Sequence, residues 1–307
     1  MNIKNLLQKK LIKALIIIAL GYLSYRVVHF IDSRAEGFTM EKIHSTLPYS
    51  QKWAVPMSQE QIDFANSILD QPFHYLGRGF QCYAFVSADN KYVLKFFRHH
   101  RMRLPQFLDY VPDSIPFVKQ FKKDKKASCK KRMRYLFTGI KVGFENAQEE
   151  TALLFVHLNK TQKQHKTVKV IDKIGNEYLV DMDEVEFMLQ RKAVHIKPTI
   201  EELMSQGKVD EAKERLSQIY DLLVKCAKKG IQDTDGALIR KNNLGYLDDH
   251  AIYIDSGKLA LKESIKNREV FAKDLKRLYP LHKWLKEKYP QLATYFDERR
   301  QKAINEL

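Results

Sequence analysis

Two glycines and one lysine have the residue types and spacing needed to hold a phosphate group. Gly77 and Gly79 flank one arginine, and Lys95 follows sixteen residues later inside an apolar run. Glycine has no Cβ, so backbone N–H groups at Gly77 and Gly79 can approach an anion closely. The ammonium group of Lys95 can reach the same anion as a point charge. The set predicts a phosphate site. The alternative is an ordinary hairpin whose glycines serve the turn and whose lysine extends to solvent at a sheet edge.

A second polar set brackets a short hairpin pattern further along the chain. Residues 244–247 and 251–254 are strand-like, and the pair Asp248-Asp249 separates them. Asn243 precedes the first strand and Asp255 follows the second, so we expect both at the same edge of the hairpin. Amide and carboxylate oxygens there suit Mg²⁺, which completes its shell with phosphate and water. Taken singly, Asp255 could instead cap a strand and Asn243 could serve a turn.

Two further carboxylates, Asp233 and Asp235, lie in a predicted loop between a helix and Asn243. A carboxylate in that place could orient or deprotonate an attacking hydroxyl group. Together with the phosphate and magnesium sets, these residues point to phosphoryl transfer.

The elements that must position these residues can be predicted from the sequence pattern. Apolar alternation predicts strands over 82–86 and 92–97, joined by the turn pair Asp89-Asn90. Ser58 and Gln61 form a capping box that predicts a helix start. Helical spacing recurs over 128–159 and over 209–229, where Gly230 ends the second helix, and two strand-like runs lie between them on either side of Gly175. The order predicts an α+β chain with a strand-rich lobe followed by a helical lobe.

Composition limits the class of protein. The chain has 307 residues, 44% of them hydrophobic, and a formal net charge of +16, so it can bury a core and is not disordered. Residues 98–134 hold twelve Lys or Arg and three Asp. Such a basic insert could meet anionic lipid or another anionic partner, although a solvated, flexible insert is equally consistent. It lacks interleaved aromatic residues, so nucleic-acid binding is disfavoured. The three cysteines have no metal-site spacing, and we expect no disulfide.

The N-terminus predicts an uncleaved membrane anchor over residues 1–31. Four lysines precede an apolar run over 14–25, which reaches position 31 if Arg26 and His29 sit at the interface. A signal peptide or an interfacial amphipathic helix is the alternative. The lysine-rich start predicts an external main domain, whereas ATP chemistry requires a cytoplasmic one; we expect a membrane protein with a cytoplasmic domain. The predicted divisions are an anchor at 1–31, a linker at 32–57, a strand-rich lobe at 58–190 with the basic insert 98–134, and a helical lobe at 191–307.

The order of these motifs resembles the protein-kinase-like superfamily, including its small-molecule and lipopolysaccharide kinase branches. The resemblance covers roughly residues 73–261 and implies a bilobal fold with an antiparallel-sheet N-lobe. Only 52 residues follow Asp255, which implies a reduced helical C-lobe. It also implies ATP and Mg²⁺ as cofactors. The roles implied are Gly77 and Gly79 in the phosphate-covering loop, Lys95 on the phosphates, Glu150 (or Glu149) as its ion-pair partner, and Phe187 to Gln190 as the hinge at adenine. The resemblance further implies that Asp235 is the catalytic carboxylate, with Asp233 in the usual His position. It implies that Asn243 (or Asn242) and Asp255 are the metal ligands.

The function implied is that of a membrane-associated atypical kinase. It would transfer the ATP γ-phosphate to a hydroxyl, such as one on a lipid-linked sugar or another envelope component. The alternative is a nucleotide-binding or inactive pseudokinase that acts as a binding module. That alternative is motivated by the catalytic segment, which reads Asp233-Thr234-Asp235 and stands eight residues before Asn243 where the usual spacing is five.

Overall fold

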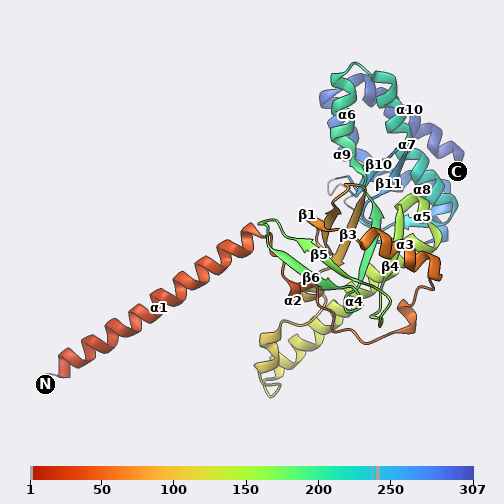
Figure 1. Ribbon diagram of the computed structural model, residues 1–307. Coiled ribbons are helices and arrows are strands. Elements are labelled where there is room, and N and C mark those ends of the chain that lie inside the picture. The colour runs from red at the N-terminus through yellow and green to blue at the C-terminus, as the bar shows by residue number, and fades with distance from the viewer. Residues whose placement is uncertain (1–2, 237, 240–242) are drawn as a thin grey trace.

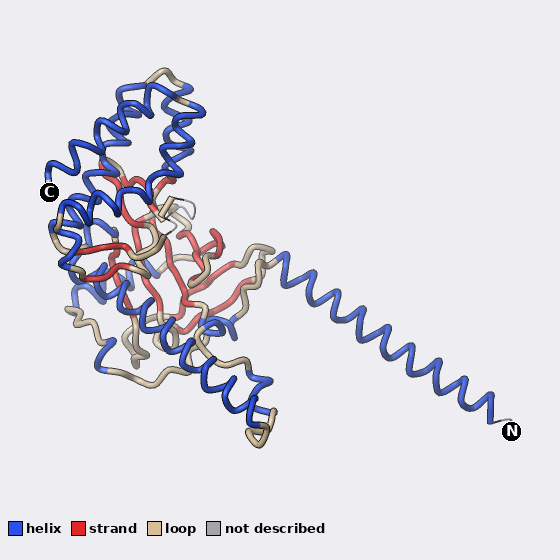
Figure 2. The backbone as a smooth tube through the Cα atoms, turned by 180° about the vertical axis from the view of Figure 1, so that it is seen from behind, coloured by secondary structure: helices blue, strands red, loops and turns tan. Residues whose placement is uncertain are grey.

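The computed structural model describes residues 3–236, 238–239 and 243–307. These residues form a sheet-rich lobe and a helix-rich lobe, and one long helix, α1 (Ile3–Arg34), extends away from both (Figure 1). Figure 2 shows most helices gathered at one end of the body, with the strands in the middle. The chain is therefore α+β, as the sequence predicts.

A curled sheet organises the first lobe. Its strand order is β4-β7-β3-β2-β1-β5-β6, and neighbouring strands run antiparallel except β1 and β5. The predicted turn at Asn90 is confirmed, because this residue has a φ of 62° between β2 and β3. The strands are β1 (Phe73–Arg78), β2 (Cys82–Ser87), β3 (Tyr92–Phe97), β4 (Leu153–His157), β5 (Thr167–Ile171), β6 (Glu177–Asp181) and β7 (Phe187–Arg191).

The segment before the sheet is not the linker that the sequence suggests. Residues 32–57 contain α2 (Met40–Ile43) and η1 (Gln51–Trp53), and their apolar side chains are buried against the sheet lobe. The Phe38 ring lies edge-on to Phe85, 4.9 Å between centroids. The linker prediction is wrong because these few large apolar groups gain more from burial than from a solvated path. The next helix, α3 (Gln59–Leu69), begins with the predicted capping box at Ser58 and Gln61.

The basic insert is largely one helix. After η2 (His99–Arg101) and η3 (Gln106–Tyr110), α4 runs from Pro116 to Asn146, and α5 (Gln148–Thr151) follows. The sequence predicts helix only from about residue 128, so it places the start of this helix too late. Pro116 lies in the first helical turn, where its missing N–H has no partner to lose and its fixed φ suits the helix.

The second lobe is built around α7 (Val209–Lys228). Its apolar face is buried, and α10 (Pro290–Glu306) packs on it through Phe296 and Tyr220, whose ring centroids are 4.7 Å apart. Gly230 ends α7 with a φ of 72°, as predicted. The other elements are β8 (Val194–His195), α6 (Ile196–Ser205), β9 (Ile231–Asp233), β10 (Leu244–Leu247), β11 (His250–Tyr253), β12 (Leu259–Leu261), η4 (Glu263–Lys266), α8 (Arg268–Asp274), η5 (Leu275–Leu278) and α9 (Tyr279–Lys288).

The N-terminal helix α1 carries the apolar run that predicts a membrane anchor. Lys13 and Arg26 flank this run. A search of the described residues finds no helix that is both long and apolar enough to cross a membrane, so the predicted spanning helix at 1–31 is not supported.

Candidate functional site

One cavity lies where the two lobes meet. It has a volume of about 310 Å³ and is walled by β1, β2, β3 and β7 of the sheet lobe and by the start and end of the β10–β11 hairpin. It brings together six of the residues singled out in the sequence: Gly77, Gly79, Lys95, Gln190, Asn243 and Asp255.

The glycine loop forms one wall of this cavity. The N–H of Gly79 donates to the carbonyl of Cys82 at 2.9 Å, which closes the β1–β2 turn. A Cβ added at Gly77 would meet no described protein atom within 4 Å. Packing within the protein therefore does not require glycine at position 77, whereas close approach of a ligand to the backbone would.

Lys95 lies in the middle of β3 and is 8% exposed. Its ammonium donates to Oε1 of Gln190 and to the carbonyl of Ile254, each at 2.6 Å. Burial lowers the pKa of Lys95, and the nearby Asp255 carboxylate opposes that effect. A lysine held in this way is positioned between the lobes and close to the predicted metal ligand.

Gln190 ties the two lobes together. Its Nε2 donates to the carbonyl of Thr151 at 2.6 Å and to that of Tyr253 at 3.0 Å, while its Oε1 accepts from Lys95. Every polar atom of this buried amide is therefore engaged, which fixes the position of the ammonium group.

The predicted hinge over Phe187 to Gln190 is placed wrongly. These residues lie inside β7, which pairs with β3 on one side and β4 on the other, and Phe187 is fully buried. Their backbone groups serve the sheet and cannot meet an adenine ring. The connection between the lobes is the segment 191–195, and four of its residues line the cavity: Arg191, Lys192, Ala193 and His195.

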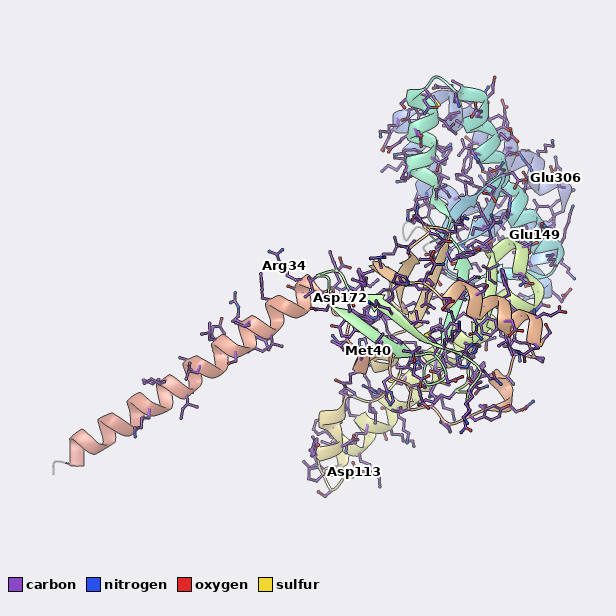
Figure 3. The ribbon with its side chains drawn as sticks, in the orientation of Figure 1. Arg34, Met40, Asp113, Glu149, Asp172 and Glu306 are labelled. Atoms are coloured by element: carbon purple, nitrogen blue, oxygen red, sulfur yellow. The ribbon has the colours of Figure 1, made fainter. Side chains whose placement is uncertain are left out.

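Glu150 is not the partner of Lys95. It lies on α5, is 2% exposed, and its Oε1 is 2.6 Å from Nζ of Lys229 and 3.3 Å from Nζ of Lys225 on α7. The alternative, Glu149, also pairs with Lys225, and Figure 3 shows it beside the helical lobe. Both carboxylates face α7 because α5 turns its acidic side to the helical lobe. The predicted pair of Glu150 with Lys95 is therefore wrong, and Glu150 instead joins the lobes through its ion pairs with Lys225 and Lys229.

Replacing Glu150 with Gln is expected to lower the free energy of unfolding by about 1–3 kcal/mol, because a buried ion pair loses one charge. Chemical denaturation measures this change. Glu149→Gln is the matched control: its side chain is 69% exposed, and surface pairs contribute only about 0–1 kcal/mol. A tenfold loss of nucleotide affinity in Glu150→Gln without loss of stability would show that Glu150 serves the cavity instead.

Asn243 and Asp255 meet at one edge of the β10–β11 hairpin. The carbonyl of Asn243 accepts from the N–H of Ile254 at 2.7 Å and from that of Asp255 at 3.4 Å. Nδ2 of Asn243 donates to Oδ2 of Asp235 at 3.3 Å, so its amide oxygen is turned away from that carboxylate. The alternative ligand, Asn242, lies outside the described residues.

The side chains of Asn243 and Asp255 fit a magnesium site that is completed by phosphate and water. No three His, Cys, Asp or Glu residues gather closely enough to hold a metal ion anywhere in the described ranges. Asn243 and Asp255 supply an amide oxygen and a carboxylate. That is the small protein share expected for Mg²⁺, which takes its other ligands from phosphate and water.

Asp235 lies beside this edge, and Asp233 serves another purpose. Oδ1 of Asp235 is 3.2 Å from Nζ of Lys258. Asp233 is 2% exposed, pairs with Arg277 at 2.9 Å and accepts from the N–H of Asp235 at 2.7 Å. Burial raises the pKa of Asp233 to about 7, although Arg277 opposes this. Asp233 therefore holds the loop that carries Asp235.

Helix α4 contacts the turn that follows Asp255, which the sequence analysis missed. A Cβ at Gly139 would lie 2.6 Å from the backbone carbon of Gly257 and 2.7 Å from the carbonyl oxygen of Ser256. One turn further on, Gly143 lies against the side chain of Ser256. The spacing of two glycines four residues apart within a helix was the available signal.

Gly139→Ala is expected to destabilise the protein by about 1–2 kcal/mol, because the overpacking cost exceeds the roughly 1 kcal/mol that alanine contributes to a helix. It is also expected to weaken Mg²⁺-nucleotide binding, since the displaced turn carries Asp255. Thermal unfolding with and without nucleotide measures both effects. The exposed helical position Ser128→Ala is the control, and equal behaviour of the two variants would contradict the close contact.

Comparison with known proteins finds similarity among solved structures. No family model matches the chain, and no curated protein matches it. The solved structure of the bifunctional kinase-methyltransferase WbdD is similar over 72% of this chain and 43% of its own, at 14% identity and a TM-score of 0.36. The chain thus corresponds to less than half of that protein. The described residues form a sheet lobe that carries the glycine loop and Lys95, and residues 191–195 join it to a helix-rich lobe that carries Asn243 and Asp255, the order of lobes predicted from the sequence.

Proposed function

We propose that the protein is an ATP- and Mg²⁺-dependent phosphotransferase that acts on a hydroxyl group. The observation that carries this proposal is the meeting of Gly77, Gly79, Lys95, Asn243 and Asp255 around one cavity. These residues come from both lobes and from positions up to 178 apart in the sequence. An ordinary hairpin would not require the second set of residues at the same place.

Each residue has a distinct task in the proposed reaction. The glycine loop covers the phosphates, and Lys95 neutralises their charge. Asn243 and Asp255 hold Mg²⁺, which when bound supplies charge neutralisation at the transferred phosphoryl group. The acceptor oxygen bonds to the γ-phosphorus while the bond to the bridging oxygen breaks and ADP leaves. The hydroxyl proton passes to Asp235, which lies next to Asn243.

The acceptor we propose is an envelope component such as a lipid-linked sugar, reached from the cytoplasmic side of a membrane. Two features favour it. Helix α4 carries a cluster of cations, and α1 exposes large apolar side chains, including Leu20, Leu23 and Phe30, to solvent. Cationic and apolar surfaces together favour contact with anionic lipid.

A second candidate is a nucleotide-binding module without transfer. The observation behind it is the ion pair between Lys258 and Asp235, which engages the carboxylate that should receive the proton. A pseudokinase would retain nucleotide binding and lack turnover.

Titration of the full chain with Mg²⁺-ATP, followed by thermal unfolding, tests the shared part of both candidates. Specific binding is expected to raise the stability by about 2.7 kcal/mol at a nucleotide concentration one hundred times Kd. Asp255→Asn should lose most of this rise. No rise at millimolar nucleotide in the wild-type protein would contradict both candidates, and γ-phosphate transfer to a hydroxyl acceptor separates them.

A further inference from the structure

A second and larger opening lies next to the nucleotide cavity. It has a volume of about 1230 Å³, against about 310 Å³ for the cavity between the lobes. We call it the α4 groove. One wall is α4, and the other is formed by Thr234 and the segment 258–262, with Phe80 and Gln81 of the glycine loop at the end nearest the nucleotide cavity.

Most of the α4 wall is one face of the helix. Six of its seven lining positions, 127, 130, 131, 134, 135 and 138, recur at intervals of three and four residues, which places them on one side; Arg132, the seventh, lies off this face. Lys130 and Arg134 are thus neighbours of like charge, an arrangement that destabilises an isolated helix.

The groove is lined by cations without acids. Among its described lining residues there are six Lys or Arg and no Asp or Glu, although acids make up 37 of the 307 residues of the chain. Clustered like charges repel one another, and a bound anion removes that repulsion. The cationic residues are Lys130, Lys131, Arg132, Arg134, Lys258 and Lys262.

The groove ends beside the ion pair of the proposed catalytic carboxylate. Nζ of Lys258, a lining residue, lies 3.2 Å from Oδ1 of Asp235, and the Thr234 hydroxyl donates to the carbonyl of Lys258 at 2.9 Å. Asp235 itself is 7% exposed and is not a lining residue, so a hydroxyl presented from the groove meets it at its contact with Lys258 while the anionic groups lie against α4. An anionic group next to that hydroxyl would also compete with Asp235 for Lys258.

The aromatic residues of the groove argue against a nucleic acid. The Phe80 ring, 56% exposed, has two guanidinium groups close to it, with the central carbon of Arg101 at 4.5 Å and that of Arg132 at 5.3 Å from its centroid. Base stacking on successive aromatic rings, typical of single-strand binding, has no such row of open faces here. Tyr135, 58% exposed, is the other aromatic side chain among the described lining residues.

We infer that the α4 groove binds the acceptor and that the acceptor is a multiply phosphorylated sugar. The phosphate groups lie along Lys130, Lys131 and Arg134, and a neighbouring hydroxyl reaches Asp235. The role of that hydroxyl rests on the proposed phosphotransfer, whereas the binding of the phosphates does not.

Binding of inositol hexakisphosphate to the full chain tests this inference, because this probe carries closely spaced phosphates on a six-membered ring. Calorimetry at 150 mM NaCl is expected to show binding that Lys131→Glu weakens by about tenfold or more, given the strength of charge-assisted hydrogen bonds. Lys125→Glu is the matched control. It makes the same charge reversal at an exposed position of α4 outside the groove lining, and we expect less than about a twofold change there, in line with a weak surface charge effect.

Further arms separate this inference from the proposed function. Lys131→Glu should keep the wild-type stabilisation by Mg²⁺-ATP. Equal weakening of the probe by both lysine variants, or no binding of the probe, overturns the groove assignment even when nucleotide binds. Tighter binding of a thymidine 20-mer than of the probe overturns the sugar-phosphate class. If the probe binds, Lys131→Glu alone weakens that binding, and Mg²⁺-ATP does not stabilise the protein, then the anion site is upheld and the phosphotransferase is rejected.

Discussion

Replacing Lys95 with Met is expected to lower kcat/KM for phosphoryl transfer from ATP by about 10²–10³, the range seen when one preorganised charge-stabilising donor is removed. The ammonium group is buried, directed by Gln190 and the carbonyl of Ile254, and close to Asp255. No neighbouring cation in the described lining of the cavity has this central position. Steady-state assays with labelled ATP measure the loss.

The control for Lys95→Met is Lys91→Met, in the exposed turn before the same strand. It removes one lysine charge from the sheet lobe without touching the cavity, so its rate should match the wild type. The free energy of unfolding of nucleotide-free Lys95→Met must be measured as well, because the substitution changes stability in two opposite ways. It removes an unfavourable buried charge, but it leaves the two oxygen partners of Lys95 without a hydrogen-bond donor. Equal rates for Lys95→Met and Lys91→Met would reject Lys95 as a phosphate ligand.

Much of the candidate site could be predicted because local patterns define its strands. The alternation over 82–86 and the run over 92–97 fix β2 and β3, and thereby the location of Lys95 on the inner strand. Asn243 and Asp255 could be paired because a hairpin places its two ends together, whatever the rest of the fold does. These predictions depend on contacts between residues close in the sequence.

The errors concern relations between elements that lie far apart. The helical spacing predicted over 128–159 extends too far, because residues 153–157 form β4, and it cannot show which lobe Glu149 and Glu150 face. The same holds for the hinge: β7 pairs with β3 on one side and β4 on the other, and the sequence does not show where this pairing ends. The early start of α4 at Pro116 is an exception, because proline in a first helical turn is a local signal that could have been used.

The contact between α4 and the turn at Ser256 and Gly257 links these separate features. The same helix provides the cationic wall of the α4 groove and packs directly on the turn that carries Asp255. A shift of α4 would therefore move the wall of the α4 groove and the proposed metal ligand Asp255 together. The close backbone approach at Gly139 makes this coupling mechanical, since there is no flexible side chain between the two backbones to absorb a displacement.

Asp235→Asn is expected to keep the stabilisation by Mg²⁺-ATP and to lower kcat for transfer by about 10²–10⁴, the usual contribution of a general base. An asparagine retains an oxygen for Nδ2 of Asn243 but cannot accept the acceptor proton, and it loses the ion pair with Lys258. Single-turnover assays measure the rate, and nucleotide-dependent unfolding measures binding. Asp249→Asn, an exposed change in the β10–β11 turn, is the control.

The three possible results for Asp235→Asn decide between the two candidate functions. A selective loss of rate identifies Asp235 as the base. A variant that transfers phosphate as fast as the wild type removes Asp235 from the mechanism. A wild-type protein that binds Mg²⁺-ATP but transfers no faster than Asp235→Asn, in the presence of a phosphorylated sugar acceptor, is a nucleotide-binding module, and the ion pair at Lys258 then marks a carboxylate whose catalytic use has been lost.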